Sequence, residues 1–162
     1  MKVIDNFLPY YQFNKLESFL MGDDFPWFYN DGIVSWDDGR YQFTHTFYDM
    51  RAPWNGGTVY FSSIIEPLLY NFGVTKLHRV KANLRSKSWF NRGSVYHRDL
   101  DNVTTAILYL NTNNGYTKFK KGGKVKSVEN RIVIFDTSLE HMAVSCTDQK
   151  TRVVINFNYY AR

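Results

Sequence analysis

Residues 97–111 read HRDLDNVTTAILYLN, and this segment says most about the architecture. Its second half, from Val103 to Asn111, is rich in Val, Thr, Ile and Tyr, which favour the pleated backbone of a β-strand. Similar short runs, separated by turn residues, continue from about residue 76 to the end of the chain. The expected strands cover 77–85, 94–99, 103–111, 116–119, 124–128, 131–135, 141–146 and 151–160.

Two of the intervening segments carry the residues of tight turns, Asn113-Asn114-Gly115 and Lys121-Gly122-Gly123. Eight short strands without helices between them indicate an all-β sandwich or barrel, a class that includes the jelly roll. We therefore predict a mainly β core over residues 76–160.

The first 75 residues show a different pattern. Residues 8–22 are expected to form a helix that presents Phe13, Leu16 and Leu20 on one face and ends at Gly22. A second helix is expected over 59–72, where Pro67 predicts a kink or a late start. Residues 25–57 are expected to add edge strands and a loop over the site. Residues 1–75 would then support the core within one domain of 162 residues.

The charge of the chain is distributed unevenly. Residues 1–66 hold 4 Lys or Arg against 9 Asp or Glu, whereas residues 67–162 hold 16 against 6. No acidic residue lies between Glu66 and Asp99, but seven basic ones do: Lys76, Arg79, Lys81, Arg85, Lys87, Arg92 and Arg98. Such a field attracts anions. It is explained equally by a solvated basic face, an anionic co-substrate or a nucleic acid.

Two features bear on the compartment. The chain has one cysteine, Cys146, so no intrachain disulfide can form and an oxidising compartment is not required. Neither an apolar signal core near Met1 nor an apolar run of the length of a membrane span, roughly 20 residues, is found. We expect a cytoplasmic protein without a membrane partner.

The segment His97-Arg98-Asp99 contains the first candidate metal ligands. Residues i and i+2 of a strand point to one face, so the imidazole and the carboxylate would project together. His141 follows an apolar run, 132–135, that is typical of a buried strand. Two His and one carboxylate form the facial triad of non-haem iron. An isolated His-x-Asp pair, by contrast, is more often an ion pair at a strand end.

Other polar residues strengthen the metal interpretation. Arg152 lies eleven residues after His141, and strand alternation places it on one face with Val154 and Asn156. A guanidinium group suits bidentate binding of a carboxylate. Thr105 and Tyr109 share a face of the 103–111 strand. Tyr109 could bind the same carboxylate, but an ordinary core tyrosine bonded to a backbone carbonyl is equally compatible with the spacing.

Taken together, these residues resemble the iron(II)/2-oxoglutarate dioxygenases, and in particular the prolyl 4-hydroxylase-like branch. The similarity rests on His97-Arg98-Asp99, Thr105-Ala106-Ile107-Leu108-Tyr109-Leu110-Asn111, Gly115, Asn130-Arg131-Ile132-Val133-Ile134-Phe135, His141 and Arg152. The motifs cover about 76–160, and the overall style is similar to small oxygenases encoded by tailed phages, which would act in the host cytoplasm. The Gly-Gly of the prolyl hydroxylases is replaced by Gly115-Tyr116.

The resemblance implies a double-stranded β-helix, which is a jelly roll with iron inside it. His97, Asp99 and His141 would be the Fe(II) ligands and the catalytic centre. Arg152 would bind the distal carboxylate of 2-oxoglutarate, with Tyr109 and Thr105 assisting. Asn83, which alternates with Arg85 on one face of the preceding strand, occupies a place where related enzymes contact the co-substrate.

The implied reaction uses 2-oxoglutarate and O2 as co-substrates to hydroxylate a C–H bond of a primary substrate. The branch points to a peptidyl or free proline as the target, most simply in a peptide or protein, whereas the basic 67–162 region favours a nucleobase-directed oxygenase. Two functions of a different kind are also compatible with the sequence: a non-catalytic jelly-roll binding module, and a zinc hydrolase using the same three ligands.

Overall fold

The computed structural model describes residues 1–33, 39–52 and 58–161. The expected loop over the site falls partly on residues 34–38 and 53–57, which lie outside the described residues. No helix in the described ranges is long and apolar enough to cross a lipid bilayer.

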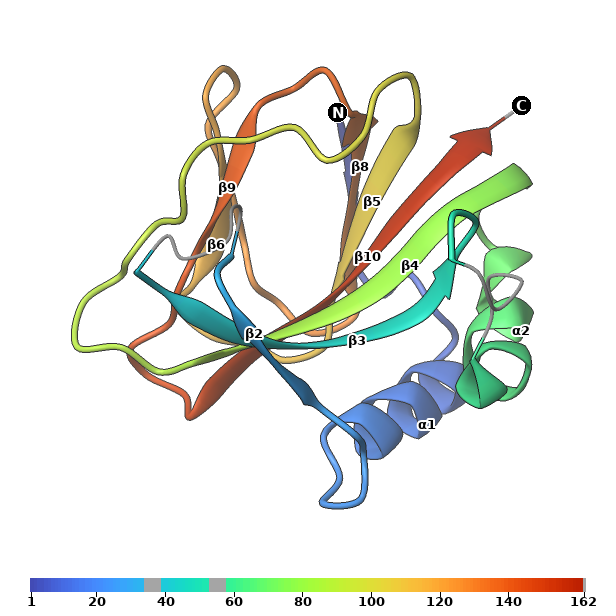
Figure 1. Ribbon diagram of the computed structural model, residues 1–162, viewed down its shortest axis with the longest axis horizontal. Helices are drawn as coiled ribbons and strands as arrows, with labels where there is room; N and C mark the ends of the chain where they lie inside the picture. Colours follow the sequence, from blue (N-terminus) through green and yellow to red (C-terminus); the bar gives the residue numbers. More distant parts are fainter. Residues whose placement is uncertain (34–38, 53–57, 162) are drawn as a thin grey trace.

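Two antiparallel sheets face each other, as Figure 1 shows. The larger sheet has the strand order β1 (Lys2–Ile4), β8 (Arg131–Asp136), β5 (Thr104–Tyr109), β10 (Thr151–Ala161), β4 (Val74–Ser86), β3 (Tyr41–Asp49) and β2 (Phe28–Asp31). The smaller sheet has the order β7 (Lys124–Lys126), β6 (Tyr116–Phe119) and β9 (His141–Val144). The mainly β jelly roll expected from the sequence is confirmed.

Seven of the eight expected strands are present, with ends shifted by a few residues. The expected strand 94–99 is wrong, because around this segment the described residues form two isolated bridges to β9, Gly93–Val144 and His97–His141, and a backbone bond from Ser94 to Ala143, but no continuous ladder. Between these two pairs the Ser94 hydroxyl accepts the Ala143 N–H at 3.2 Å. A side chain that takes a backbone donor competes with the regular strand ladder. Strand β1, which the sequence patterns did not indicate, pairs with β8 along the edge of the larger sheet.

The N-terminal helices are shorter than expected. Helix α1 spans Tyr10–Leu20 and directly follows Pro9. The second helical segment starts at Val59, as expected, and continues as a π-helical turn, η1 (Phe61–Ile65), and then as α2 (Glu66–Leu69). Pro67 lies in the first turn of α2, where a helix needs no backbone N–H partner. Gly73, with a φ of 62°, lies in the connection to β4.

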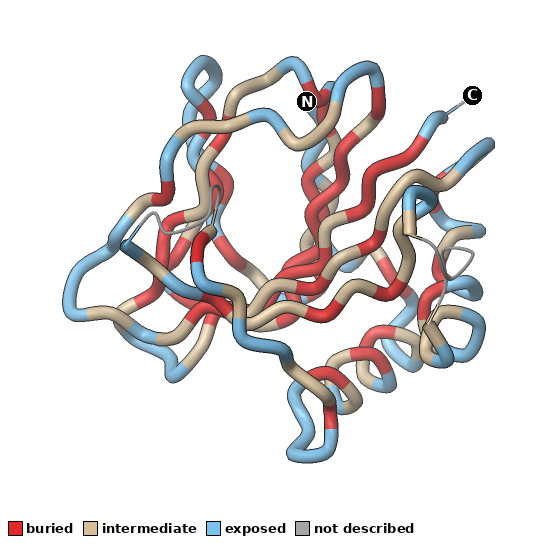
Figure 2. Tube along the Cα trace, viewed as in Figure 1, coloured by how far each residue is buried: buried red, intermediate tan, exposed pale blue. Residues whose placement is uncertain are grey.

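The larger sheet has an apolar face and a polar face. On β10, Val153, Ile155, Phe157 and Tyr159 belong to the same buried cluster as Phe13, Leu16 and Leu20 of α1. The alternate residues of β10 point between the two sheets. Helices α1 and α2 cover the apolar face (Figure 1), and Figure 2 shows the buried residues concentrated along the central strands.

A smaller apolar cluster lies between the sheets. Its buried members are Ile107, Tyr109, Phe119, Val125, Val133, Phe135 and Val154. Since this cluster fills only part of the interior, the remaining inner face of the larger sheet is free to carry polar side chains.

Asn130 connects the N-terminal segment to the β core. Its side chain accepts the Leu8 N–H at 2.9 Å and donates to the Leu8 carbonyl at 2.8 Å. Its backbone has a φ of 54°, in the left-handed region that asparagine tolerates better than most residues. Asn130 and Leu8 are both buried.

We predict that Asn130→Ala lowers the free energy of unfolding by roughly 2–4 kcal/mol, since it strands two buried polar groups and strains the backbone. Asn130→Gly loses the same hydrogen bonds but avoids the backbone strain, so it should lower the free energy of unfolding by less than Asn130→Ala does. Urea denaturation followed by circular dichroism measures both. Equal destabilisation by the two variants would show that the backbone conformation contributes nothing.

Candidate metal centre

A single backbone pairing brings the two histidines together. His141 is the first residue of β9, and His97 lies opposite it, with each backbone N–H donating to the other carbonyl at 3.0 Å. Residues that are directly opposite in an antiparallel pair place their side chains on the same face. The two imidazole centroids are 4.6 Å apart. Asp99, two residues beyond His97, projects to the same side.

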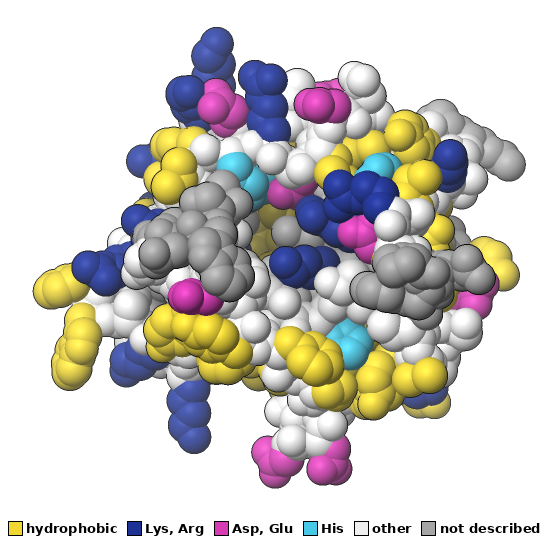
Figure 3. Space-filling model, viewed as in Figure 1, with side chains coloured by type: hydrophobic (Ala, Val, Ile, Leu, Met, Phe, Trp, Pro, Cys, Tyr) yellow, Lys and Arg dark blue, Asp and Glu magenta, His cyan; other side chains and the backbone are white. Residues whose placement is uncertain are grey.

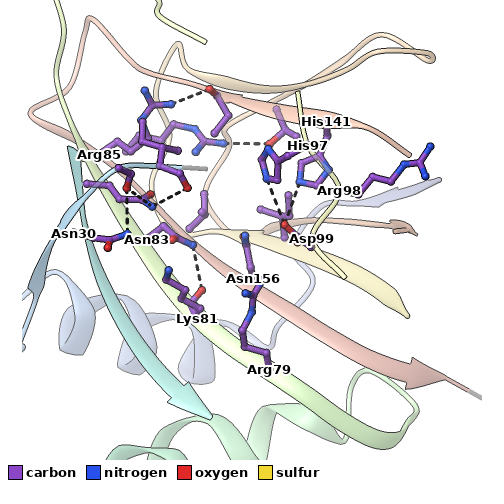
Figure 4. Close-up of a pocket in the computed structure, with 18 of the residues that line it drawn as sticks. Asn30, Arg79, Lys81, Asn83, Arg85, His97, Arg98, Asp99, His141 and Asn156 are labelled. Carbon is purple, nitrogen blue, oxygen red and sulfur yellow. Dashed lines mark hydrogen bonds and ion pairs between the residues drawn. The ribbon is translucent and has the colours of Figure 1, made fainter. Parts of the chain in front are cut away.

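The three side chains converge on one point (Figure 4). Asp99 Oδ1 lies 3.4 Å from His97 Nε2 and 3.9 Å from His141 Nε2. One ligand atom from each residue can be chosen so that all lie within 4.8 Å of one another. His97, Asp99 and His141 therefore form a site with the dimensions needed to hold one metal ion.

Backbone carbonyls set the orientation of both imidazoles. His97 Nδ1 lies 3.1 Å from the Val95 carbonyl oxygen, and His141 Nδ1 lies 3.3 Å from that of Leu139. A carbonyl only accepts, so each Nδ1 must carry the proton and donate it. The neutral ring then presents the lone pair of Nε2 towards Asp99, which is the tautomer that a metal requires.

Asn158 of β10 contacts the carboxylate oxygen of Asp99 that does not face the histidines. The Asn158 amide donates to Asp99 Oδ2 at 3.2 Å and lies 3.1 Å from the Thr105 hydroxyl. Arg79 Nε donates to the Asn158 Oδ1 at 3.2 Å. These contacts fix one carboxylate oxygen of Asp99 and leave the other facing the histidines.

The charge state of the triad also fits a cation. Burial opposes ionisation of Asp99, but contact with His97 and the charges of His141 and Arg79 outweigh it, so the carboxyl pKa is held well below its usual range. Burial lowers the pKa of His141. For His97, burial acts in the same direction, but the Asp99 carboxylate outweighs it and raises the pKa. The carboxylate is therefore ionised and ready to bind a metal at neutral pH.

Arg152 forms a second polar centre between the sheets. Its side chain is 2% exposed, and it donates to the Ser127 hydroxyl at 2.9 Å and the Thr117 hydroxyl at 3.2 Å. Its guanidinium carbon lies 5.5 Å from the centre of the Tyr109 ring. Within the described ranges no carboxylate forms an ion pair with Arg152. Burial lowers the pKa of this guanidinium, and a buried cation of this kind requires an anionic partner.

The other expected co-substrate contacts occupy different positions. The Tyr109 hydroxyl donates to Thr117 at 2.8 Å and so supports the arginine through an intermediate hydroxyl. Thr105 lies next to Asn158, on the Asp99 side of the interior. Asn83 lines the cavity, and its amide donates weakly to the Lys81 carbonyl at 3.4 Å. Of the four residues expected to bind the co-substrate, Arg152 and Asn83 reach the cavity wall.

The triad and Arg152 open into a single cavity of about 350 Å³. Its charged lining residues are Asp31, Arg79, Lys81, Arg85, Arg98, Asp99 and Arg152, so that five cations face two acids, and the neutral polar lining includes Asn30, Gln42, Asn83, Thr117 and Asn156. Figure 3 shows basic side chains gathered around the hollow on this face. The basic balance of residues 67–162 is thus concentrated in part inside the molecule.

Three supporting residues were not identified from the sequence. Asn158 continues the Arg152–Val154–Asn156 alternation by one more step, so extending that pattern would have found it. Thr117 alternates with the buried Phe119 on β6, which places it on the inner face. Ser127 follows β7 and gives no comparable signal.

No protein-family model matches the chain, and no curated protein matches it by sequence. Solved structures do resemble it. An oxidoreductase of the 2OG-Fe(II) oxygenase family from Burkholderia pseudomallei superposes with a TM-score of 0.73 at 11% identity, covering 98% of this chain and 84% of that one.

Two prolyl hydroxylases also resemble the chain. The enzyme from Trichoplax adhaerens, in complex with a hypoxia-inducible factor oxygen degradation domain peptide fragment, gives a TM-score of 0.65 at 16% identity and covers 98% of this chain and 82% of that one. A Pseudomonas putida prolyl-4-hydroxylase gives 0.58 at 15% identity, covering 99% and 92%. The chain therefore has the fold found in 2OG-Fe(II) oxygenases, and its His-Asp-His group could hold a metal.

We predict that Asn158→Ala weakens metal binding about 10- to 100-fold, because the Asp99 carboxylate loses the donor that orients it. Calorimetric titration with Co(II) measures this. Asn156→Ala, two positions along the same strand, removes an amide that does not contact Asp99 and is the matched control. Equal metal affinities for the two variants would contradict the assigned role of Asn158.

Proposed function

We propose that this protein is an Fe(II)- and 2-oxoglutarate-dependent oxygenase that hydroxylates a C–H bond. One observation carries the proposal: a His-Asp-His group with the geometry of a metal site opens into the same cavity as Arg152, a buried guanidinium without a carboxylate partner in the described ranges. The first feature fits a ferrous ion, and the second fits the distal carboxylate of a dicarboxylic acid.

The residues present fit Fe(II). Two imidazole nitrogens and one carboxylate oxygen make the donor set of the non-haem iron oxygenases, and both imidazoles already present the coordinating nitrogen. When bound, the ion would supply open coordination positions for a chelating 2-oxo acid and for dioxygen. The overall reaction would convert 2-oxoglutarate, O2 and a C–H bond into succinate, carbon dioxide and an alcohol.

The chain would contribute binding, orientation and exclusion of water. Arg152 would bind the distal carboxylate through the remaining N–H groups of its terminal nitrogens, and Ser127 and Thr117 would hold its guanidinium plane in place. Tyr109 would orient the Thr117 hydroxyl by donating a hydrogen bond to it. Asn158 would keep the Asp99 carboxylate turned towards the ion. Because the site lies between two packed sheets, these groups act in a medium where each charge interaction is strong.

A zinc hydrolase and a non-catalytic jelly roll explain fewer of these features. The hydrolase would use the three ligands but would give Arg152 no role. The non-catalytic module would need neither the three ligands nor Arg152. For the primary substrate, a proline in a peptide or protein is favoured by the motif resemblance, and a nucleobase is favoured by the basic balance of residues 67–162.

We predict that anaerobic addition of Fe(II) and 2-oxoglutarate produces the weak visible charge-transfer band of the chelate, and that succinate forms once oxygen is admitted. His97→Ala and Asp99→Ala should abolish both signals, because two ligands hold the metal poorly.

Arg152→Ala should retain metal binding but raise the 2-oxoglutarate concentration for half-maximal band intensity by about tenfold or more, as expected for the loss of a charge-assisted contact. Lys118→Ala, which changes an exposed residue of β6, is the control. Unchanged 2-oxoglutarate affinity in Arg152→Ala would refute the role of the arginine, and absence of the band in the native protein would refute the function.

A further inference from the structure

Two basic residues of the cavity wall are assigned neither to the metal nor to the carboxylate of the co-substrate. Arg79 and Lys81 lie two positions apart on β4, so they project from the same face, and both line the cavity together with His97 and Asp99. Figure 4 shows them with Asn156, from the neighbouring strand β10, on one side of Asp99. Arg79, Lys81 and the adjoining Asn156 are together called the β4 basic wall below, after the two basic residues of β4.

The Lys81 ammonium lacks a counter-charge of its own. Within the described ranges it makes no hydrogen bond or ion pair. Burial, followed by the charge of Arg79, lowers the pKa of Lys81, and the Asp99 carboxylate opposes this shift from a distance. A metal bound to Asp99 would take up that negative charge and leave Lys81 with less compensation.

Arg79 and Asn156 have unused hydrogen-bonding capacity beside Lys81. Arg79 uses Nε for Asn158, and its terminal nitrogens make no hydrogen bond within the described ranges. Asn156 stands directly opposite Lys81 in the β10–β4 register. Its Nδ2 makes no hydrogen bond within the described ranges and can donate to an anion, whereas its Oδ1, buried without a partner there, can only accept. Buried polar groups in native proteins are normally satisfied, so this unpaired Oδ1 indicates a ligand that also carries a hydrogen-bond donor, next to the anionic group that the amide nitrogen can bind.

This wall is separate from the proposed 2-oxoglutarate contact. In the same register Arg152 pairs with Arg85, four positions along the strands from the Asn156–Lys81 pair, which corresponds to about 13 Å. One small carboxylate cannot satisfy both places. Asn158, which contacts Asp99, pairs with Arg79 in the same register, so the β4 basic wall lies beside the metal ligand and is available for a second anion if Arg152 binds the distal carboxylate of the co-substrate.

We propose that the primary substrate is a small organic anion, whose carboxylate or phosphate group is bound by Lys81, Arg79 and Asn156 so that its C–H bond lies beside the metal. This proposal rests on the proposed oxygenase function. A proline residue is neutral and largely apolar, and would bury the two cations without a counter-charge. A nucleic acid binds along an open basic groove, whereas this wall lies inside a cavity of about 350 Å³.

Binding of defined probes tests the proposal directly. Propionate and phenyl phosphate represent the two anion sources, and propionamide is the neutral counterpart of propionate. Their affinities are measured by calorimetry on protein loaded anaerobically with Fe(II) and 2-oxoglutarate, and again on metal-free protein. We expect at least one anion to bind, propionamide to bind more weakly than propionate, and Lys81→Met to raise the dissociation constant of the anion about tenfold.

Lys118→Met is the matched control, because it makes the same substitution at an exposed lysine that does not line the cavity. Asn156→Ala, which removes a neutral group, should weaken anion binding by a smaller factor. Both Lys81→Met and Asn156→Ala should leave the 2-oxoglutarate chelate band unchanged, which separates this wall from the Arg152 contact. The probe that binds more tightly, propionate or phenyl phosphate, shows whether the substrate carries a carboxylate or a phosphate group.

The proposal is overturned if Lys81→Met and Lys118→Met bind both anions equally well. It is also overturned if a proline-containing peptide or a single-stranded oligonucleotide raises succinate formation as much in Lys81→Met as in the native protein. Loss of the chelate band in the native protein would instead refute the oxygenase function, while the metal-free calorimetry would still decide whether Lys81 binds an anion.

Discussion

The reciprocal backbone hydrogen bonds between His97 and His141 are the constraint on which the centre depends. They join the long connection after β4 to the first residue of β9, and they place two imidazoles side by side although 44 positions separate them in the chain. Strand β9 is itself held by β6, where Phe119 pairs with His141. Since the segment around His97 has few other ladder contacts, the loss of this pair would separate the candidate metal ligands.

The larger sheet divides stability and function between its two faces. Its outer face is apolar and packs against α1 and α2, whereas its inner face carries Arg79, Lys81, Asn83, Arg152 and Asn158 along β4 and β10. Burying so many polar groups is unfavourable unless each finds a partner. The hydroxyl groups around Arg152 and the Asn158 amide next to Asp99 supply part of that compensation. The hydrogen-bond donors that remain unpaired face the cavity, where ligands would supply their partners.

Period-two patterns explain why much of this arrangement could be predicted from the sequence. The alternation Arg152–Val154–Asn156 predicted the inner face of β10, and His97-x-Asp99 predicted two candidate ligands on one side. The strand expected at 94–99 was wrong because the Ser94 side chain interrupts its ladder, which residue preferences do not record. Strand β1 is too short to produce a pattern, and Ser127 reaches Arg152 only through the tertiary fold. The tautomers of the two histidines depend on carbonyl positions that no sequence displays.

Our central proposal is that His97, Asp99 and His141 hold one metal ion beside a dicarboxylic acid bound by Arg152. Crystals soaked anaerobically with Mn(II) and 2-oxoglutarate, measured at the manganese absorption edge, test it most directly. We predict one anomalous peak within coordination distance of both Nε2 atoms and of Asp99, with the distal carboxylate of 2-oxoglutarate bonded to the Arg152 guanidinium. A peak elsewhere, or a co-substrate that leaves Arg152 without an anion, would contradict the claim.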